Sequence, residues 1–492
     1  MKVLLVYCNS MLENALPISI TQLSSCLKEA GIEVNLFDTT FYKWGRKSDM
    51  ENRIEGLQFQ PCPIRYINGD VYTDFLNKVE TFKPDVIGMS VVEPTFILGM
   101  KLLTSAREFI KRNGIRVAVG GVHAVLAPET VSKYGDLVDY ICISEGEKAF
   151  IELCQKIERG ESVDKQVGFW VRKGVQWLKN DRMPLTDLDT LPNLDFSLFG
   201  PEYLNKPMMG KVFRTISLET SRGCAYRCSY CGSESLTKLF KSHGGWFRQK
   251  SIGKVMKEFE YHAKKYDPEF LYIISDSFLN NSYEWIKTFS EEYKKFSIPF
   301  WFCCRPESVS SEKIQLMKEI SCARVSIGIE SGNEQFRRKT LHRHVSNERM
   351  LLAGEILKGF DISFSVNIII GFPSETREMI FDSIELCRQI NPDNVSTHIF
   401  SPYHGSELRD VCIREGYIEQ DLIADDLFQG YTLRGSALSA EQIMGLFRTI
   451  PLYVKFPKNE YGRIEIAEKL NDEGNKEFAL LKDEYYKEMG WV

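Results

Sequence analysis

Strand and helix patterns alternate through the first part of this chain. Continuous apolar runs are typical of parallel strands that are covered on both faces. Between them lie helical stretches, one near 95–113 and another at 17–31, where Ile20, Leu23 and Leu27 recur at helical spacing. Five strands alternating with helices predict a doubly wound parallel sheet over residues 1–158. The five runs are 2–8 (KVLLVYC), 32–38 (IEVNLFD), 85–92 (DVIGMSVV), 115–121 (IRVAVGG) and 139–147 (DYICISEGE).

The pattern changes after this first domain. Residues 159–210 contain VGFWVRKGVQWLKN, which resembles a hairpin turning at Lys173-Gly174, and prolines then mark an extended connector. From 211 the alternation resumes with six strands, so residues 211–405 predict a partial (β/α)6 barrel. Residues 406–492 are charged and helix-prone, which predicts a small helical domain that covers the open side of the barrel.

Three cysteines form a tight cluster, Cys224, Cys228 and Cys231, spaced C-x3-C-x2-C. A structural zinc site needs four ligands, but the nearest histidine is His243 and no second C-x2-C follows. Each of the four irons of a cubane iron–sulfur cluster needs a ligand besides sulfide, so three cysteines leave one iron open. The loop follows a predicted strand, where barrels place their chemistry. We therefore predict a 4Fe-4S cluster here; packing cysteines clustered by chance are the alternative.

The C-x3-C-x2-C loop resembles that of the radical S-adenosylmethionine (SAM) enzymes, which usually place an aromatic residue before the last cysteine, as Tyr230 does here. In that family the open iron chelates SAM. Its reductive cleavage gives a 5′-deoxyadenosyl radical that takes a hydrogen atom from the substrate. The resemblance implies a 4Fe-4S cluster and SAM as cofactors, with a flavodoxin or ferredoxin as electron donor.

The same resemblance implies SAM contacts at the ends of the later barrel strands. Asp276 stands where Gly-Gly-Glu is more frequent in the family. Arg305 could bind a carboxylate in bidentate fashion or be an ordinary surface charge. Gly371 allows close approach to adenine, or serves a tight turn. The implied SAM-binding residues are Tyr230, Asp276, Arg305, Glu330, Ser331, Gly371 and Phe372.

The amino-terminal sheet has no G-x-G-x-x-G after its first strand, which argues against a dinucleotide. Ser90 and Gly120-Gly121 instead end its third and fourth strands, at the edge where open α/β sheets bind ligands. These positions resemble the cobalamin-binding domain, with Val92 in place of a leucine. The segment CNSMLENALP (8–17) lacks the family's Asp-x-His-x-x-Gly loop. The resemblance therefore implies base-off cobalamin without a protein histidine ligand.

GGVH (120–123) and SEGE (144–147) resemble segments of cobalamin-dependent radical SAM proteins. His123 could instead be a surface or turn histidine, and Glu145 could simply favour the start of a helix. The segment 401–408 resembles a PYPGT segment of relatives, which makes Tyr403 and His404 substrate candidates. The implied cobalamin-binding residues are Ser90, Gly120, Gly121, His123, Glu145 and Gly146.

The leading hypothesis is a cobalamin-dependent radical SAM methyltransferase that methylates an unactivated carbon of a small molecule or peptide. The alternatives are a cobalamin-associated cyclase, ring-contraction or oxygen-inserting enzyme, and a non-catalytic cobalamin sensor, which the intact cysteines disfavour. A transfer-RNA methylthiotransferase would need three further cysteines in the front domain, but Cys8, Cys26 and Cys62 belong to different predicted elements.

Composition limits the partners and the compartment. The net charge of −5 gives no reason to expect nucleic acid. Apolar runs are shorter than the ~18 residues of a membrane span, and the first residues lack a signal peptide's apolar core. Thirteen cysteines with one tight cluster fit a reducing compartment. We therefore expect a cytoplasmic protein with no nucleic-acid or membrane partner.

Overall fold

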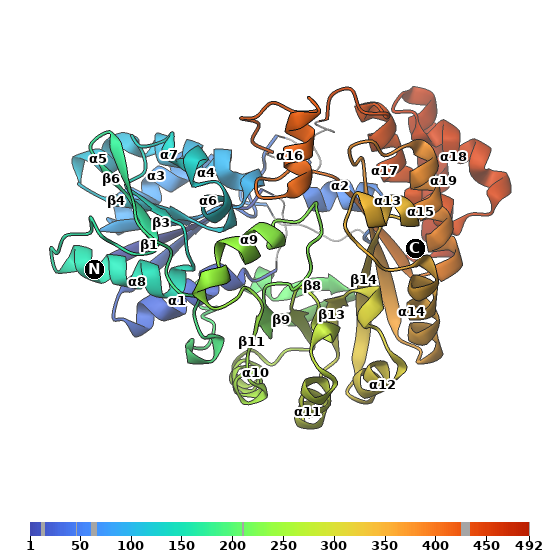
Figure 1. Cartoon of the computed structure of the whole chain (residues 1–492), viewed down its shortest axis with the longest axis horizontal. Helices are drawn as coiled ribbons and strands as arrows, with labels where there is room; N and C mark the ends of the chain where they lie inside the picture. The colour runs from blue at the N-terminus through green and yellow to red at the C-terminus, as the bar shows by residue number, and fades with distance from the viewer. Residues whose placement is uncertain (11–14, 46, 61–65, 209–210, 425–432, 492) are drawn as a thin grey trace.

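A computed structural model describes residues 1–10, 15–45, 47–60, 66–208, 211–424 and 433–491. Cys62 lies outside the described residues. Two seven-stranded sheets form the two halves of the described structure: the front domain lies at the left of Figure 1, and the second sheet with the last helices lies at the centre and right. No described helix is long and apolar enough to cross a membrane.

The front sheet has the order β2-β1-β3-β4-β5-β6-β7. Its first five strands are parallel, which confirms the predicted doubly wound sheet. The predicted hairpin also forms, and β6 pairs antiparallel with β5, so the hairpin extends this sheet. The strands are β1 (Lys2–Tyr7), β2 (Glu33–Asp38), β3 (Val86–Ser90), β4 (Arg116–Gly120), β5 (Tyr140–Cys142), β6 (Phe169–Lys173) and β7 (Gln176–Lys179).

Helices cover both faces of this sheet because neighbouring strand residues point to opposite sides. Val3 and Leu5 pack with the helices of one face, and Leu4 and Val6 with those of the other. The stretch 95–113, predicted as one helix, is two helices that meet at Ala106. The first face holds α1 (Ile18–Glu29) and α8 (Gly146–Glu158); the other holds α3 (Val71–Phe82), α4 (Glu93–Ser105), α5 (Arg107–Arg112), α6 (Val122–Leu126) and α7 (Pro128–Ser132).

The second sheet is the predicted partial barrel. Its order is β16-β15-β14-β13-β12-β9-β8, with six parallel strands and β8 antiparallel at one edge. The strands are β8 (Asn205–Met208), β9 (Lys211–Glu219), β12 (Phe270–Ile274), β13 (Phe300–Cys304), β14 (Cys322–Glu330), β15 (Ser363–Ile370) and β16 (Asn394–Ile399). The helices outside them are α10 (Ile252–Tyr266), α11 (Tyr283–Tyr293), α12 (Ser311–Glu319), α14 (Asn347–Gly359) and α15 (Arg377–Ile390), which lie along the lower and right sides of Figure 1.

The last segment is helical, as predicted: α16 (Glu407–Arg414), α17 (Ala440–Lys455), α18 (Tyr461–Glu468) and α19 (Asp472–Glu488). Of these, α17 shares the barrel core. The edge strand β16 is also covered by a segment of the front domain, which the sequence did not indicate. Gln58, which follows α2 (Asp49–Glu55) of the front domain, accepts the Thr397 N–H at 3.2 Å and a bond from the Asn394 amide at 2.6 Å. A front-domain segment therefore closes this edge of the barrel.

Candidate functional site

The cysteine loop begins at the end of β10 (Ser221–Arg222) and leads into α9 (Ser233–Leu239). Gly223 has a φ of +89°, and a Cβ there would lie 2.4 Å from the Trp246 carbonyl oxygen, so this tight start needs glycine. Cys228 is buried and Cys231 is exposed. The Cys228 sulfur lies 3.2 Å from Arg305 Nη1. Burial, together with the charges of Asp276 and Cys228, raises the pKa of the Cys224 thiol.

Three thiols on one loop match the donor set of a cubane with one open iron. Arg305 is buried and turned inward, with its guanidinium 3.7 Å from the Tyr226 ring centre. The alternative of a surface charge at Arg305 is therefore wrong. Asp276 lies just past the end of β12 and is exposed.

Glu330 and Tyr230 meet through a residue that the sequence analysis did not single out, Arg343. Its Nη1 lies 3.4 Å from Glu330 Oε1 and 3.3 Å from the Tyr230 hydroxyl. Glu330 has a φ of +63° and ends β14 where the pairing register shifts, which turns its side chain at the strand end. Burial raises the pKa of Glu330. Arg343 lies in a loop without a strand-end pattern, so its sequence position gave no signal.

The turn after β15 is built on a second unpredicted residue, Glu375. Gly371 has a φ of +81°, and the N–H groups of Gly371 and Phe372 donate to Glu375 Oε2 at 2.6 and 3.2 Å. Burial raises the pKa of Glu375 to about 8. The Phe372 ring is fully buried against Tyr230, so Gly371 and Phe372 can present only backbone to a ligand. Ser331 is buried as well, and its hydroxyl has no hydrogen-bond partner among the described residues.

A cavity of about 380 Å³ lies at the carboxyl ends of the front strands. Its floor is largely apolar, with Leu5 and Phe150, and glycines widen it: a Cβ on Gly88 would lie 2.6 Å from the Phe150 ring. Five of the six predicted cobalamin residues line this cavity: Ser90, Gly120, Gly121, Glu145 and Gly146. His123 is the exception, because its buried side chain turns toward Glu93.

The far wall of the same cavity belongs to the barrel, with Glu219 and Arg222 ahead of the cysteine loop and Leu236 after it. Arg222 is the main link, because its guanidinium donates to Glu145 and Glu147 at 2.8 Å and to Glu219 at 3.0 Å. Burial alone would raise the pKa of Glu145, but Arg248 and Arg222 lower it to about 2. The acids at the start of α8 therefore bind arginines of the barrel rather than only favouring the helix.

The cavity suits a cobalamin tail, because its glycine-lined, apolar floor can accommodate a flat aromatic group. The substrate candidates Tyr403 and His404 lie elsewhere, in the loop between β16 and α16. The first turn of α16, directly after that loop, approaches the cysteines, because the Leu408 N–H donates to the Ser229 carbonyl oxygen at 2.9 Å.

Several known proteins resemble this chain in amino-acid sequence, at low sequence identity. The chain is 23% identical over 346 residues to the uncharacterized methyltransferase PH0819 of Pyrococcus horikoshii, covering 70% of this chain and 72% of that protein. It is also 23% identical over 339 residues to the anaerobic magnesium-protoporphyrin IX monomethyl ester cyclase of Rubrivivax gelatinosus, covering 67% of this chain and 59% of the cyclase.

Among solved structures, the radical S-adenosylmethionine methyltransferase TsrM of Kitasatospora setae, with cobalamin and a [4Fe-4S] cluster bound, shares the fold. It superimposes with a TM-score of 0.61 at 17% identity, over 93% of this chain and 86% of that chain. The family model of the B12 binding domain matches residues 5–154, and that of the radical SAM superfamily matches residues 218–387. The chain therefore carries a B12 binding domain followed by a radical SAM domain.

Proposed function

We propose that this chain is a cobalamin-dependent radical SAM methyltransferase. The observation that carries the proposal is the shared cavity wall: Ser90 and Gly121 of the front domain face Arg222 and Leu236, which flank the cysteine loop. Methyl transfer between two cofactors needs them to face each other at short range. The methyltransferase relatives support the same reaction class.

The cofactors would supply the difficult steps, since SAM bound at an open cluster iron gives a carbon radical and cobalamin carries a methyl group. We assign the cluster to Cys224, Cys228 and Cys231. Arg305, Glu330, Ser331, Asp276 and the 371–372 backbone would then bind SAM; Arg343 holds Glu330 and Tyr230 in place. The front cavity would bind cobalamin without an imidazole ligand, because His123 is committed to other partners.

The chain's own residues orient and shield these groups. Arg222 and Arg248 fix Glu145 at the rim of the cavity, so the rim is rigid before a cofactor enters. We propose a small molecule or peptide as substrate, bound near the 401–406 loop, and an external one-electron donor such as a flavodoxin or ferredoxin.

Anaerobic turnover of the reconstituted enzyme tests the proposal. Each methylation uses one SAM as methyl donor and one as radical source, so S-adenosylhomocysteine and 5′-deoxyadenosine should form in equal amounts. Deoxyadenosine without S-adenosylhomocysteine would refute a methyltransferase. It would favour the chemistry of the cyclase relative instead.

A further inference from the structure

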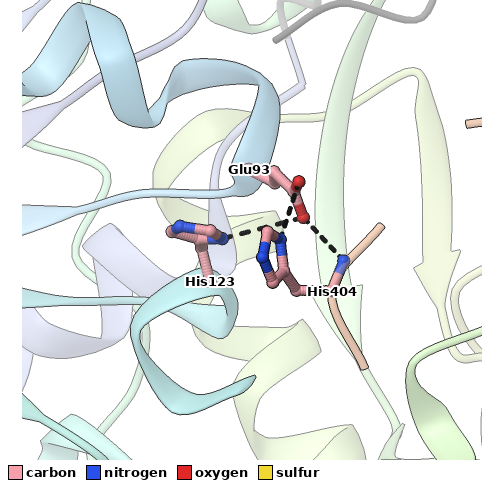
Figure 2. A group of neighbouring side chains, drawn as sticks. All are labelled: Glu93, His123 and His404. Atoms are coloured by element: carbon pink, nitrogen blue, oxygen red, sulfur yellow. Dashed lines mark hydrogen bonds and ion pairs between the residues drawn. The ribbon is translucent and has the colours of Figure 1, made fainter. Parts of the chain in front are cut away.

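Two buried side chains, Glu93 and His123, meet the half-buried His404 from the other half of the molecule, away from the cofactor cavity (Figure 2). Glu93 is the first residue of α4, three residues after Ser90 of the cavity. His123 is in α6, two residues after Gly121, which also lines the cavity. His404 belongs to the loop that follows β16. The cluster therefore joins the two segments of the cobalamin cavity to a loop of the barrel.

Glu93 holds that loop through several contacts at once. Its Oε2 accepts the His404 N–H at 2.8 Å, and its Oε1 accepts the Ala424 N–H at 2.9 Å. The His404 Nδ1 lies 2.9 Å and the Arg409 guanidinium 3.6 Å from Oε1. The Glu93 side chain is only 4% exposed. Burial alone would raise its pKa, but the contacts with His404 lower it, so the carboxylate is ionised.

The other side of the loop rests on the cysteine motif. Leu408 donates its N–H to the carbonyl oxygen of Ser229, which lies between the second and third cysteines. Arg409 ties the loop internally by donating to the carbonyl oxygens of Pro402 and Leu422 at 2.7 and 2.6 Å. Residues 401–408 are thus held between the front domain and the cysteine loop.

A metal ion is a competing interpretation, because ligand atoms of the three residues lie within 4.8 Å of one another. Charge argues against it. The Arg409 guanidinium already neutralises Glu93, and a divalent cation beside it would be repelled in a buried site. Both carboxylate oxygens also accept backbone N–H groups. Hydrogen bonding therefore accounts for the arrangement better than chelation.

We propose that Glu93 is a positioning residue: it fixes the 401–406 loop across the barrel mouth, in a defined place relative to the cobalamin cavity. The importance of this loop for methyl transfer rests on the proposed function. Glu93 would act through the loop, where Tyr403 and His404 stand, and would touch neither cofactor.

Hydrogen exchange of the full chain tests this placement without relying on turnover. In Glu93→Gln, peptides covering 401–408 and 417–424 should exchange about a hundredfold faster, because the change leaves Arg409 buried without its counter-charge. His404→Ala keeps the backbone bond to Glu93, so a smaller increase is expected; it also serves if Glu93→Gln does not fold. Glu108 is an exposed residue of the neighbouring α5, so Glu108→Gln is the matched control, and its peptides should exchange at the wild-type rate.

Two further readouts separate positioning from general instability. Hydroxocobalamin affinity of Glu93→Gln should stay within about threefold of wild type, whereas its ratio of S-adenosylhomocysteine to deoxyadenosine should fall. Unchanged exchange at 401–408, or faster exchange throughout β3 and β4, would overturn the proposal. One equivalent of zinc bound by the wild type and lost in Glu93→Gln would also overturn it, in favour of a metal site. A wild type that makes no S-adenosylhomocysteine would refute the methyltransferase while leaving the exchange test intact.

Discussion

The charge network between the two domains gives a prediction whose size can be worked out. Replacing Arg222 by methionine keeps an unbranched apolar side chain but removes the partner of Glu147 and Glu219, while Arg248 still holds Glu145. The side chains of these two acids are less than a tenth exposed. Breaking a buried pair in this way costs about 3–5 kcal/mol, because a buried charge is left uncompensated.

Both acids lose this counter-charge at once, so the free energy of unfolding of Arg222→Met should be at least about 3 kcal/mol below that of the wild type.

Urea unfolding of the metal-free chain, followed by tryptophan fluorescence, measures this difference, since Trp246 lines the cavity beside Arg222. Arg414→Met is the matched control: its pair with Glu415 is exposed and should contribute about 0.5 kcal/mol or less. A loss below about 1 kcal/mol for Arg222→Met, or an equal loss for Arg414→Met, would refute the reasoning.

Three further predictions concern the cofactor sites. Cys228→Ala should lose the cluster's iron and visible absorption after anaerobic reconstitution, whereas Cys154→Ala, from a buried helix position, should retain them; equal iron in both would exclude the assigned ligands. Gly121→Ala should lower hydroxocobalamin affinity at least about tenfold in a spectroscopic titration, because its Cβ would lie 2.4 Å from the Val91 carbonyl oxygen; unchanged affinity would show that this turn is not part of the site. Burial raises the pKa of Glu375 to about 8. The protonated Glu375 side chain therefore contributes fully to the free energy of unfolding below the ordinary carboxyl pKa, and this contribution is lost as pH rises through 8. Relative to Glu375→Gln, the wild type should therefore lose about 2–3 kcal/mol of unfolding free energy in urea between pH 6 and 8, and a pH-independent difference would contradict the assigned burial effect.

The sequence predicted what depends on local pattern. Apolar runs identified the parallel strands, and the three cysteines identified the loop that follows β9, because both signals lie within a few consecutive residues. Strand-end residues such as Glu330 and Gly371 could be placed once the strands were known.

Contacts between distant segments could not be predicted in this way. Arg343 lies in a loop whose partners are set by the closure of the barrel, and nothing near Glu93 in the sequence points to a loop more than three hundred residues later. His123 was predicted at the cofactor because GGVH lies at a strand end, yet its ring turns to Glu93 on the neighbouring helix. The break between α4 and α5 was missed because the helical pattern of 95–113 is continuous in the sequence.

Because a front-domain segment covers β16, the order in which the chain is synthesised limits the order in which its two halves can pack together. Leu57 and Gln58 are completely buried, and Leu57 packs into the hydrophobic core of the barrel. Leu57 and Gln58 leave the ribosome long before β16 is synthesised. This segment of the front domain therefore cannot pack against β16 until about 340 further residues have been made. The halves of this enzyme are thus poor building blocks for exchange: a barrel grafted behind a foreign front domain would expose an edge strand ready to pair with other chains.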